Sequence, residues 1–320
     1  MAVRLKDIAE ACGMDPSTVS RALRGDPRVK EETRQRIVAI ASSLGYEPNL
    51  NARSLVAGRS QTVWMLLSSL HSTHEVGPAA HVSMVLAQQG YETFIAQFHG
   101  DLERYAALLR KLNQGMADGA LIIPGPLHVL TPLQRLMDQQ YPLVFLDRHI
   151  EGAPVPYVTT ANVDAAAELC RRCLQDGARS AVLLFPPQNP VQKARYRGVM
   201  ETVKQHDIPW LSGRDCSERL LAQLPTPIAI LSTDQTTISD FLQTHQTVLQ
   251  HKTMIFSVFD AWRGEPWPAL RVHVCRQDFN RIAELGATIL LEQIESGRGY
   301  NSFQPVFVPP LAFDLVERRF

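Results

Sequence analysis

The sequence predicts an α/β protein, with a small all-helical headpiece ahead of two lobes built on doubly wound parallel sheets. Three observations lead to this fold class. Residues 3–59 show the apolar spacing of short helices, and the rest of the chain alternates runs of Val, Ile, Leu and Phe with amphipathic helices. That alternation occurs in two successive sets of about 100 residues, the size of one lobe each. Apolar runs without polar alternation are typical of strands that are covered on both faces, as in a parallel sheet.

Two short helices separated by a tight turn are predicted at the start of the chain. The first has apolar residues at the spacing of one helix face: Leu5, Ile8, Ala9 and Cys12. Gly13 suits the left-handed residue that ends a helix, Asp15 offers an N-cap carboxylate, and Pro16 fits the first helical position. Val19 and Ala22 face the first helix, which leaves a polar outer face on the second. This is a helix-turn-helix pattern, although a plain helical hairpin would show the same spacing.

A third helix follows at residues 31–44, with Ile37 and Ile40 on its apolar face. Four sequence motifs lie close together in and after these helices: LKDIAEACGMDPSTVSRALRG at 5–25, V-x-E-E-T-R at 29–34, LGYEPN at 44–49 and ARSL at 52–55. The segment resembles the DNA-binding headpiece of the lactose-repressor (LacI/GalR) family of bacterial transcription regulators. The resemblance implies a headpiece at 1–58 that ends in a hinge helix at about 49–57, which folds only on operator DNA.

The resemblance also implies which residues contact DNA. In the family, a leucine of each hinge helix wedges open the central base step, and Leu55 stands at that place here; the alternative is a leucine that closes the headpiece core. Pro16 offers no donor, so discrimination there would come from a thymine methyl or from DNA shape. The expected DNA-contacting residues are Leu5, Lys6, Asp15, Pro16, Ser17, Thr18, Ser20, Arg21, Arg24, Arg28, Thr33, Tyr46, Asn49, Ala52, Arg53 and Leu55.

Charge and composition agree with a DNA-binding headpiece on a globular core. The 320 residues hold 32 Lys or Arg and 32 Asp or Glu, but residues 1–60 hold ten against seven, a small excess of the sign that phosphate contact requires. There is no apolar run of a membrane span and no signal-peptide core, so we expect a cytoplasmic protein. The pair Cys170 and Cys173 lies inside a predicted helix without a histidine partner, which favours buried cysteines over a metal or redox site.

The core is predicted to span residues 59–320. Strands are expected at 63–67, 91–97, 119–123, 143–146, 157–159, 181–185, 228–232, 254–258, 304–308 and 311–314. Helices are expected at 78–89, 102–114, 164–175, 193–206 and 281–295. The late strands return across both lobes, which gives a first lobe of about 61–157 plus 289–308 and a second of about 158–288 plus 309–320.

The core resembles, more loosely, the family's two-lobed core, which is similar to a periplasmic sugar-binding protein and closes on a small ligand. Polar residues at the carboxyl ends of strands are expected ligand contacts: Ser69, Arg148, Thr233 and Asp260. Arg195, which opens a helix of the second lobe, and Trp262, which could stack on a sugar face, complete the set, and the resemblance places Arg195 and Asp260 at effector positions of the family. An arginine and an aspartate across a cleft suit the neighbouring hydroxyls of a sugar, whereas each could instead be a structural ion-pair residue. Thr233 and Ala161 depart from the family's usual residues, which leaves the effector's identity open.

These observations predict a transcriptional regulator, a repressor of a carbohydrate-utilisation operon. A homodimer without the heptad tail of tetramers is expected to bind near-palindromic double-stranded DNA and a sugar or sugar phosphate, with no membrane, cofactor or metal. Control by a protein partner and an α/β enzyme carrying a DNA-binding domain are the alternatives. No phosphate-binding glycine loop, nucleophile elbow or catalytic triad has suitable spacing, so we do not expect an enzyme.

Overall fold

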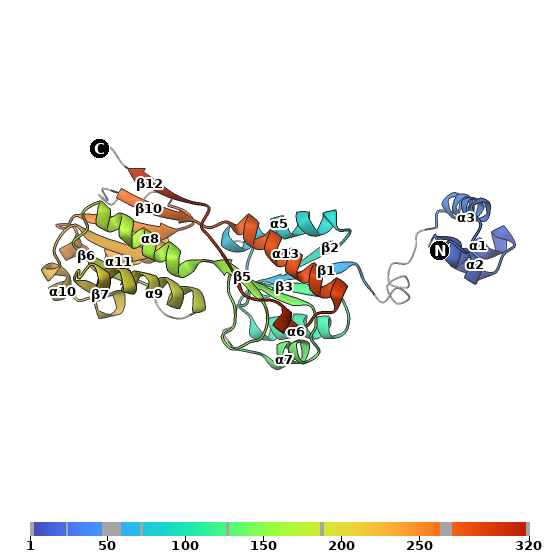
Figure 1. The fold of residues 1–320 in the computed structure, drawn as a ribbon, viewed down its shortest axis with the longest axis horizontal. Coiled ribbons are helices and arrows are strands. Elements are labelled where there is room, and N and C mark those ends of the chain that lie inside the picture. Colours follow the sequence, from blue (N-terminus) through green and yellow to red (C-terminus); the bar gives the residue numbers. More distant parts are fainter. Residues whose placement is uncertain are drawn as a thin grey trace. The chain divides into compact units, whose positions relative to one another are not determined.

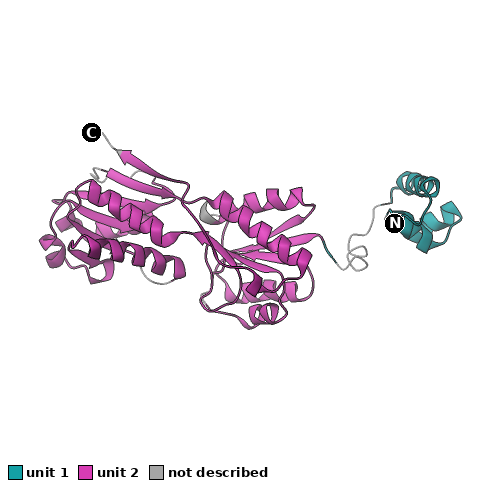
Figure 2. Ribbon diagram, in the orientation of Figure 1, with its two compact units in different colours: residues 1–60 teal, residues 61–320 magenta. Residues whose placement is uncertain are grey.

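The computed structural model describes residues 3–23, 25–46, 59–70, 73–125, 128–185, 189–262 and 271–317. The chain divides into two compact units, residues 1–60 and residues 61–320, which Figure 2 draws in separate colours. The first unit is the headpiece, and the second holds two sheets with their covering helices. Among the described residues, no helix is both long and apolar enough to cross a lipid bilayer.

The headpiece consists of α1 (Leu5–Cys12), α2 (Pro16–Leu23) and α3 (Glu31–Ser43) (Figure 1). The three helices share a core of small and branched apolar side chains: Ile8, Ala9, Cys12, Val19, Ala22, Ile37 and Ala41. Gly13, at φ +65°, ends α1, and its backbone N–H donates to the carbonyl of Glu10. The helix-turn-helix predicted from the apolar spacing is therefore confirmed.

The first lobe of the core contains a six-stranded sheet in the order β11-β5-β4-β3-β1-β2, with all pairs parallel. Its strands are β1 (Thr62–Leu67), β2 (Glu92–Gln97), β3 (Gly119–Ile122), β4 (Leu143–Leu146), β5 (Tyr157–Thr160) and β11 (Val306–Val308). Helices α5 (Thr73–Gln88) and α13 (Phe279–Ser296) cover one face. Helices α6 (Leu102–Asn113) and α7 (Thr131–Asp138) cover the other.

The second lobe has a sheet in the order β12-β10-β9-β8-β6-β7, in which only β12 is antiparallel to its neighbour. Its strands are β6 (Ser180–Leu184), β7 (Trp210–Ser212), β8 (Ile228–Ser232), β9 (Met254–Phe259), β10 (Arg271–Arg276) and β12 (Ala312–Glu317). Helices α8 (Asn162–Gln175) and α9 (Pro190–Gln205) cover one face. The other face carries α10 (Glu218–Gln223), α11 (Gln235–Thr244) and α12 (Gln246–Leu249).

The chain passes between the lobes three times, after β5, after β10 and after β11 (Figure 1). The lobe boundaries differ from the predicted divisions at 157/158 and 288/289. Strand β5 runs to Thr160 inside the first sheet, and α13 packs on the first lobe from its beginning, with Ile282, Ala283 and Leu290 in that lobe's core. A continuous apolar face keeps all of α13 on one sheet, so the crossing falls before it at residues 277–278.

Strand β10 was not predicted, because polar residues interrupt its apolar pattern. His273 is nevertheless only 4% exposed, and its Nε2 lies 2.8 Å from a carboxylate oxygen of Asp176. The other oxygen of that carboxylate accepts a 2.6 Å hydrogen bond from Arg271. A polar side chain can be buried in a central strand when a partner contacts its polar atoms, and for the Nε2 of His273 that partner follows the end of α8.

Candidate functional site

The exposed side chains of α2 form a polar face of the headpiece. Val19 and Ala22 are buried, whereas Pro16, Ser17 and Arg21 are exposed. Thr18 and Ser20 are half-buried beside them. This helix thus presents hydroxyl and guanidinium donors to solvent from its first two turns, the arrangement of a helix that reads a DNA groove.

Asp15, which was predicted at the DNA interface, begins α2. Its carboxylate accepts a 2.8 Å hydrogen bond from the backbone N–H of Ser17. Hydrogen bonds from the side chain and the backbone of Ser17 lower the pKa of Asp15, so the carboxylate stays charged at the positive end of the helix. The structure supports a capping role for this residue.

The other predicted headpiece residues fall into four groups. Lys6 is exposed and Thr33 is half-buried, whereas Leu5 and Tyr46 pack against the headpiece core. The side chain of Arg28 is 77% exposed, and its guanidinium pairs with Asp26 at 2.6 Å. The remaining predicted residues lie outside the described part of the chain, as does the predicted hinge helix at 49–57: Arg24, Asn49, Ala52, Arg53 and Leu55.

In the core, Arg195 is the centre of a buried polar network. It belongs to the second turn of α9 and is 5% exposed. Its Nε donates to the Oδ1 of Asn162 at 2.8 Å, and its Nη2 donates to the Oε1 of Gln277 at 3.2 Å. The guanidinium carbon lies 3.5 Å from the centre of the Phe259 ring, a cation–π contact.

Burial lowers the pKa of Arg195, and the carboxylates of Asp260, Asp147 and Asp234 oppose that effect. An arginine keeps its charge under such a shift because its pKa starts so high. The side chain is therefore a fixed cation with planar donors, surrounded by acceptors. Such a group suits ligand hydroxyls, which can donate to the carboxylates and accept from the guanidinium.

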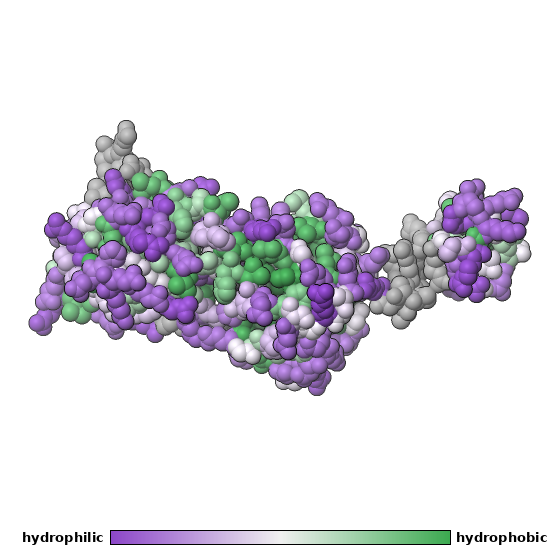
Figure 3. All heavy atoms as spheres, viewed as in Figure 1, coloured by the Kyte–Doolittle hydropathy of each residue, from purple (hydrophilic) through white to green (hydrophobic). Residues whose placement is uncertain are grey.

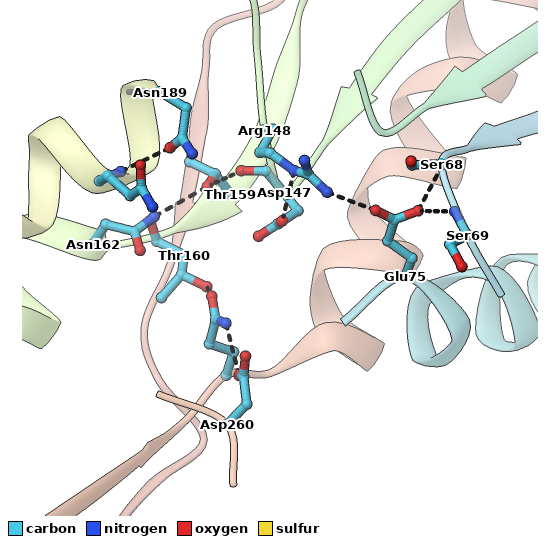
Figure 4. Close-up of polar contacts among 12 residues, drawn as sticks. Ser68, Ser69, Glu75, Asp147, Arg148, Thr159, Thr160, Asn162, Asn189 and Asp260 are labelled. Atoms are coloured by element: carbon cyan, nitrogen blue, oxygen red, sulfur yellow. Dashed lines mark hydrogen bonds and ion pairs between the residues drawn. The ribbon is translucent and has the colours of Figure 1, made fainter. Parts of the chain in front are cut away.

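Gln277 connects Arg195 to Asp260 and to the first lobe. Its Nε2 donates to the Oδ1 of Asp260 at 2.7 Å, and its Oε1 accepts from the hydroxyl of Thr160 at 2.7 Å (Figure 4). Asp260 directly follows β9 at φ +70°, an uncommon backbone conformation for a residue with a side chain. Strained backbone of this kind concentrates at functional sites, which supports the prediction for Asp260.

The first lobe contributes a second cluster at the carboxyl ends of β1 and β4. Arg148 donates to the Oε1 of Glu75 at 2.6 Å, and the Oε2 of Glu75 accepts from the backbone N–H groups of Ser68 and Ser69 (Figure 4). Asp147, at φ +61°, is 6% exposed, and one of its carboxylate oxygens lies 3.7 Å from Arg148. The predicted residues Ser69 and Arg148 therefore meet, through a glutamate that was not predicted.

Two predicted effector residues have other contacts. Thr233 donates to the carboxylate of Asp234 at 3.0 Å, and Asp234 caps α11 by accepting from the N–H of Thr237. The ring of Trp262 packs against the second lobe's core, 5.7 Å from the ring of Phe256, which favours packing over stacking on a sugar.

The residues that sequence analysis missed are Glu75, Gln277 and Phe259. Glu75 lies in the first turn of α5, a turn earlier than the predicted start of that helix, and Gln277 follows the unpredicted strand β10. If β10 had been predicted, Gln277 would have been a candidate, because it follows the carboxyl end of that strand and ligands bind beyond such ends. Phe259 ends an apolar run that has the pattern of a buried strand. Only its contact with Arg195, which the sequence does not show, sets it apart from an ordinary core residue.

The cysteines are consistent with the buried-helix interpretation. Cys170 and Cys173 of α8 are fully buried in the second lobe's core. Burial raises the pKa of Cys170 to about 12 and that of Cys173 well above its ordinary value, which keeps both as thiols. Within the described residues, no cluster of three or more His, Cys, Asp or Glu side chains could hold a metal ion.

Two hollows of the second lobe lie away from this network. One of about 550 Å³ is lined by residues around β7, including Trp210 and Leu220. Another of about 330 Å³ lies beside the end of β6, against Phe185 and Arg214. Neither hollow is lined by Arg195 or Asp260. We therefore identify the candidate site by its converging polar side chains and not by the size of a hollow.

Comparison with known proteins agrees with this architecture. Residues 4–49 match the family model for bacterial regulatory proteins of the lacI family. The chain is 28% identical to the ribose operon repressor of Bacillus subtilis over 206 residues, which cover 64% of this chain and 61% of that protein.

Two solved structures share the fold. The lac repressor dimer bound to operator and the anti-inducer ONPF has a TM-score of 0.73 at 18% identity, with 99% of this chain and 98% of that chain covered. The Cra regulator of Pseudomonas putida in complex with fructose 1-phosphate has a TM-score of 0.62 at 20% identity, over 81% of this chain and 99% of that chain. Residues 4–49 thus match the lacI family of bacterial regulatory proteins, and the two-lobed core shares the fold of these solved structures.

Proposed function

We propose that the protein is a DNA-binding transcriptional regulator that represses a carbohydrate-utilisation operon in the bacterial cytoplasm. The observation that carries this proposal is the exposed polar face of α2, with Ser17 and Arg21, on a headpiece that matches the family model. The relatives named above, an operon repressor and an operator-bound repressor, support it.

The regulator would act as a homodimer on a near-palindromic operator, because two equivalent headpieces read two half-sites. An exposed apolar surface on the first lobe supports the dimer. Figure 3 shows apolar residues gathered over α5 and α13. On α5 and the edge strand β2, Met84 is 57% exposed, Phe94 61% and Ile95 40%. An apolar patch on a helix beside an edge strand suits burial against a second copy.

The effector would be a sugar held by the network around Arg195 and Asp260, which joins residues of both lobes. A ligand that binds the closed arrangement of the lobes more tightly shifts the protein toward it, and only this difference in affinity can change operator binding. Predicted contacts of Leu55 and the hinge helix with DNA remain part of this proposal.

The proposal can be tested by selecting duplexes from a random pool with the purified full-length protein. We expect recovery of a near-palindromic site bound at least about a thousandfold more tightly than random duplex at physiological salt. A panel of free sugars is then added, and one of them is expected to change the amount of bound site. A protein with no preference for any symmetric site would contradict the proposal.

Replacing Arg21 with alanine is expected to weaken binding about tenfold on specific and random duplexes alike, because a phosphate contact carries no sequence information. The slope of log affinity against log salt should fall by about one unit. Fluorescence anisotropy at several salt concentrations measures both quantities. Arg110→Ala, which removes an exposed arginine of α6 in the first lobe, is the matched control and should leave both unchanged. Equal effects of the two variants would place Arg21 away from DNA.

A further inference from the structure

Glu75 is a buried carboxylate in the first-lobe part of the proposed effector site. It lies in the first turn of α5 and is 3% exposed. Its Oε1 accepts from Arg148 at 2.6 Å, and its Oε2 accepts from the N–H groups of Ser68 at 2.7 Å and Ser69 at 2.9 Å. Two adjacent backbone N–H groups and a guanidinium form a set of donors that binds oxyanions, phosphate included.

The chain's own carboxylate thus occupies a site with the chemistry for an anion. A phosphate group could use these donors only by displacing Glu75, which would leave a buried carboxylate beside the incoming anion and without its cation. Arg148 was predicted to contact the effector, but its charge is already neutralised by Glu75, to which it is bound.

The rest of the network adds to this exclusion. Among the described residues of the network, the other cation is Arg195, whose pKa is raised by the carboxylates of Asp260, Asp147 and Asp234. With Arg148 and Glu75 included, these described groups hold two cations against four carboxylates. A net negative field repels a phosphate dianion, whereas hydroxyl groups can both donate to carboxylates and accept from arginine.

We propose that Glu75 determines the specificity of the site, by acting as a built-in anion that excludes sugar phosphates and leaves an uncharged polyhydroxylated molecule as the effector. This inference rests on the proposed function, in which the site binds a sugar. The sequence left two classes of effector open, a sugar and a sugar phosphate. This inference excludes the sugar phosphate.

The test compares full-length wild-type protein with the Glu75→Ala variant in phosphate-free buffer. The probes are inorganic phosphate at millimolar concentration and matched pairs of fructose with fructose 1-phosphate and glucose with glucose 6-phosphate. Thermal shift and calorimetry measure binding. We expect inorganic phosphate to leave the wild type unchanged and to stabilise Glu75→Ala, with affinity raised about tenfold or more by the vacated donors.

Three further variants make the test selective. Glu75→Asp retains the carboxylate and should still exclude phosphate. Glu75→Gln retains the shape but not the charge, and replaces Glu75→Ala if that variant does not fold. Glu103→Ala removes an exposed carboxylate from the first turn of α6, with the same change in net charge, and should gain no phosphate binding.

A wild-type protein that binds a phosphorylated sugar more tightly than its free partner would overturn the inference. So would folded Glu75→Ala and Glu75→Gln variants that gain no phosphate binding over Glu103→Ala. A wild-type protein that responds to no free sugar contradicts the proposed effector control instead, and the inorganic phosphate measurement on Glu75→Ala still decides whether Glu75 occupies an anion site.

Discussion

Methionine in place of Arg195 is expected to abolish the response to free sugars while operator affinity without sugar stays within about twofold of the wild type. The substitution removes the planar donors of Arg195 and leaves Asp260 and Asp147 without the buried cation that they stabilise. Truncating one partner of a buried charged network costs about 2–5 kcal/mol of binding, which corresponds to a loss of at least about thirtyfold in affinity. Calorimetry with the free sugar that most stabilises the wild type measures this loss.

Arg197→Met is the matched control, because Arg197 lies on the same helix with an exposed side chain. It should leave sugar binding and the operator response unchanged. Arg195→Lys keeps the charge without the bidentate geometry and should fall between the two. If Arg195→Met binds sugar as well as Arg197→Met does, Arg195 is a structural residue and the effector site lies elsewhere.

The second large effect concerns the stability of the second lobe. Gly198 lies one turn after Arg195, where α9 approaches α8. A Cβ at this position would lie 2.1 Å from the carbonyl oxygen of Val163 and 3.2 Å from the backbone nitrogen of Ala167. Backbone atoms cannot move aside without separating the two helices. We therefore expect Gly198→Ala to reduce the free energy of unfolding by about 3 kcal/mol, despite alanine's better helix propensity.

Thermal unfolding by circular dichroism should show a fall in Tm of about 6–12 °C for this variant. Gly286→Ala in α13 provides a graded comparison. Its added Cβ would lie 2.3 Å from the Cδ2 of Leu146, the end of a flexible side chain that can shift, so its loss should be about 1 kcal/mol. A Gly198→Ala protein as stable as the wild type would show that α8 and α9 are not in the close contact described.

Local patterns were sufficient for the headpiece and for most of the two sheets. The apolar spacing from Leu5 to Cys12, the glycine after it and the proline at the start of α2 act within one or two helical turns, so they can be read without tertiary information. Runs such as residues 143–146 and 228–232 became fully buried strands, as expected for parallel sheets. Asp260 was proposed because polar residues at strand ends converge in such folds, and Arg195 because it opens a helix of the second lobe at a position that the family resemblance implies for the effector.

Long-range contacts explain what was missed. Strand β10 contains a buried histidine whose Nε2 contacts Asp176, a residue far away in the sequence. Helix α13 belongs to the first lobe because its apolar face meets that sheet, which no local signal indicates. Trp262 was proposed to stack on a sugar because it follows Asp260 closely, but its ring packs against the second lobe's core.

The sequence by itself determined the helix-turn-helix headpiece and the parallel α/β architecture, because periodicity is a local property, and it led us to propose the arginine–aspartate pair of the effector site. Only the tertiary structure decided that Gln277 joins that pair and that Glu75 neutralises Arg148. These contacts unite residues separated by 82 and 73 positions along the chain. The charge that a site offers to its ligand depends on which groups the fold brings into contact, and spacing along the chain does not record this.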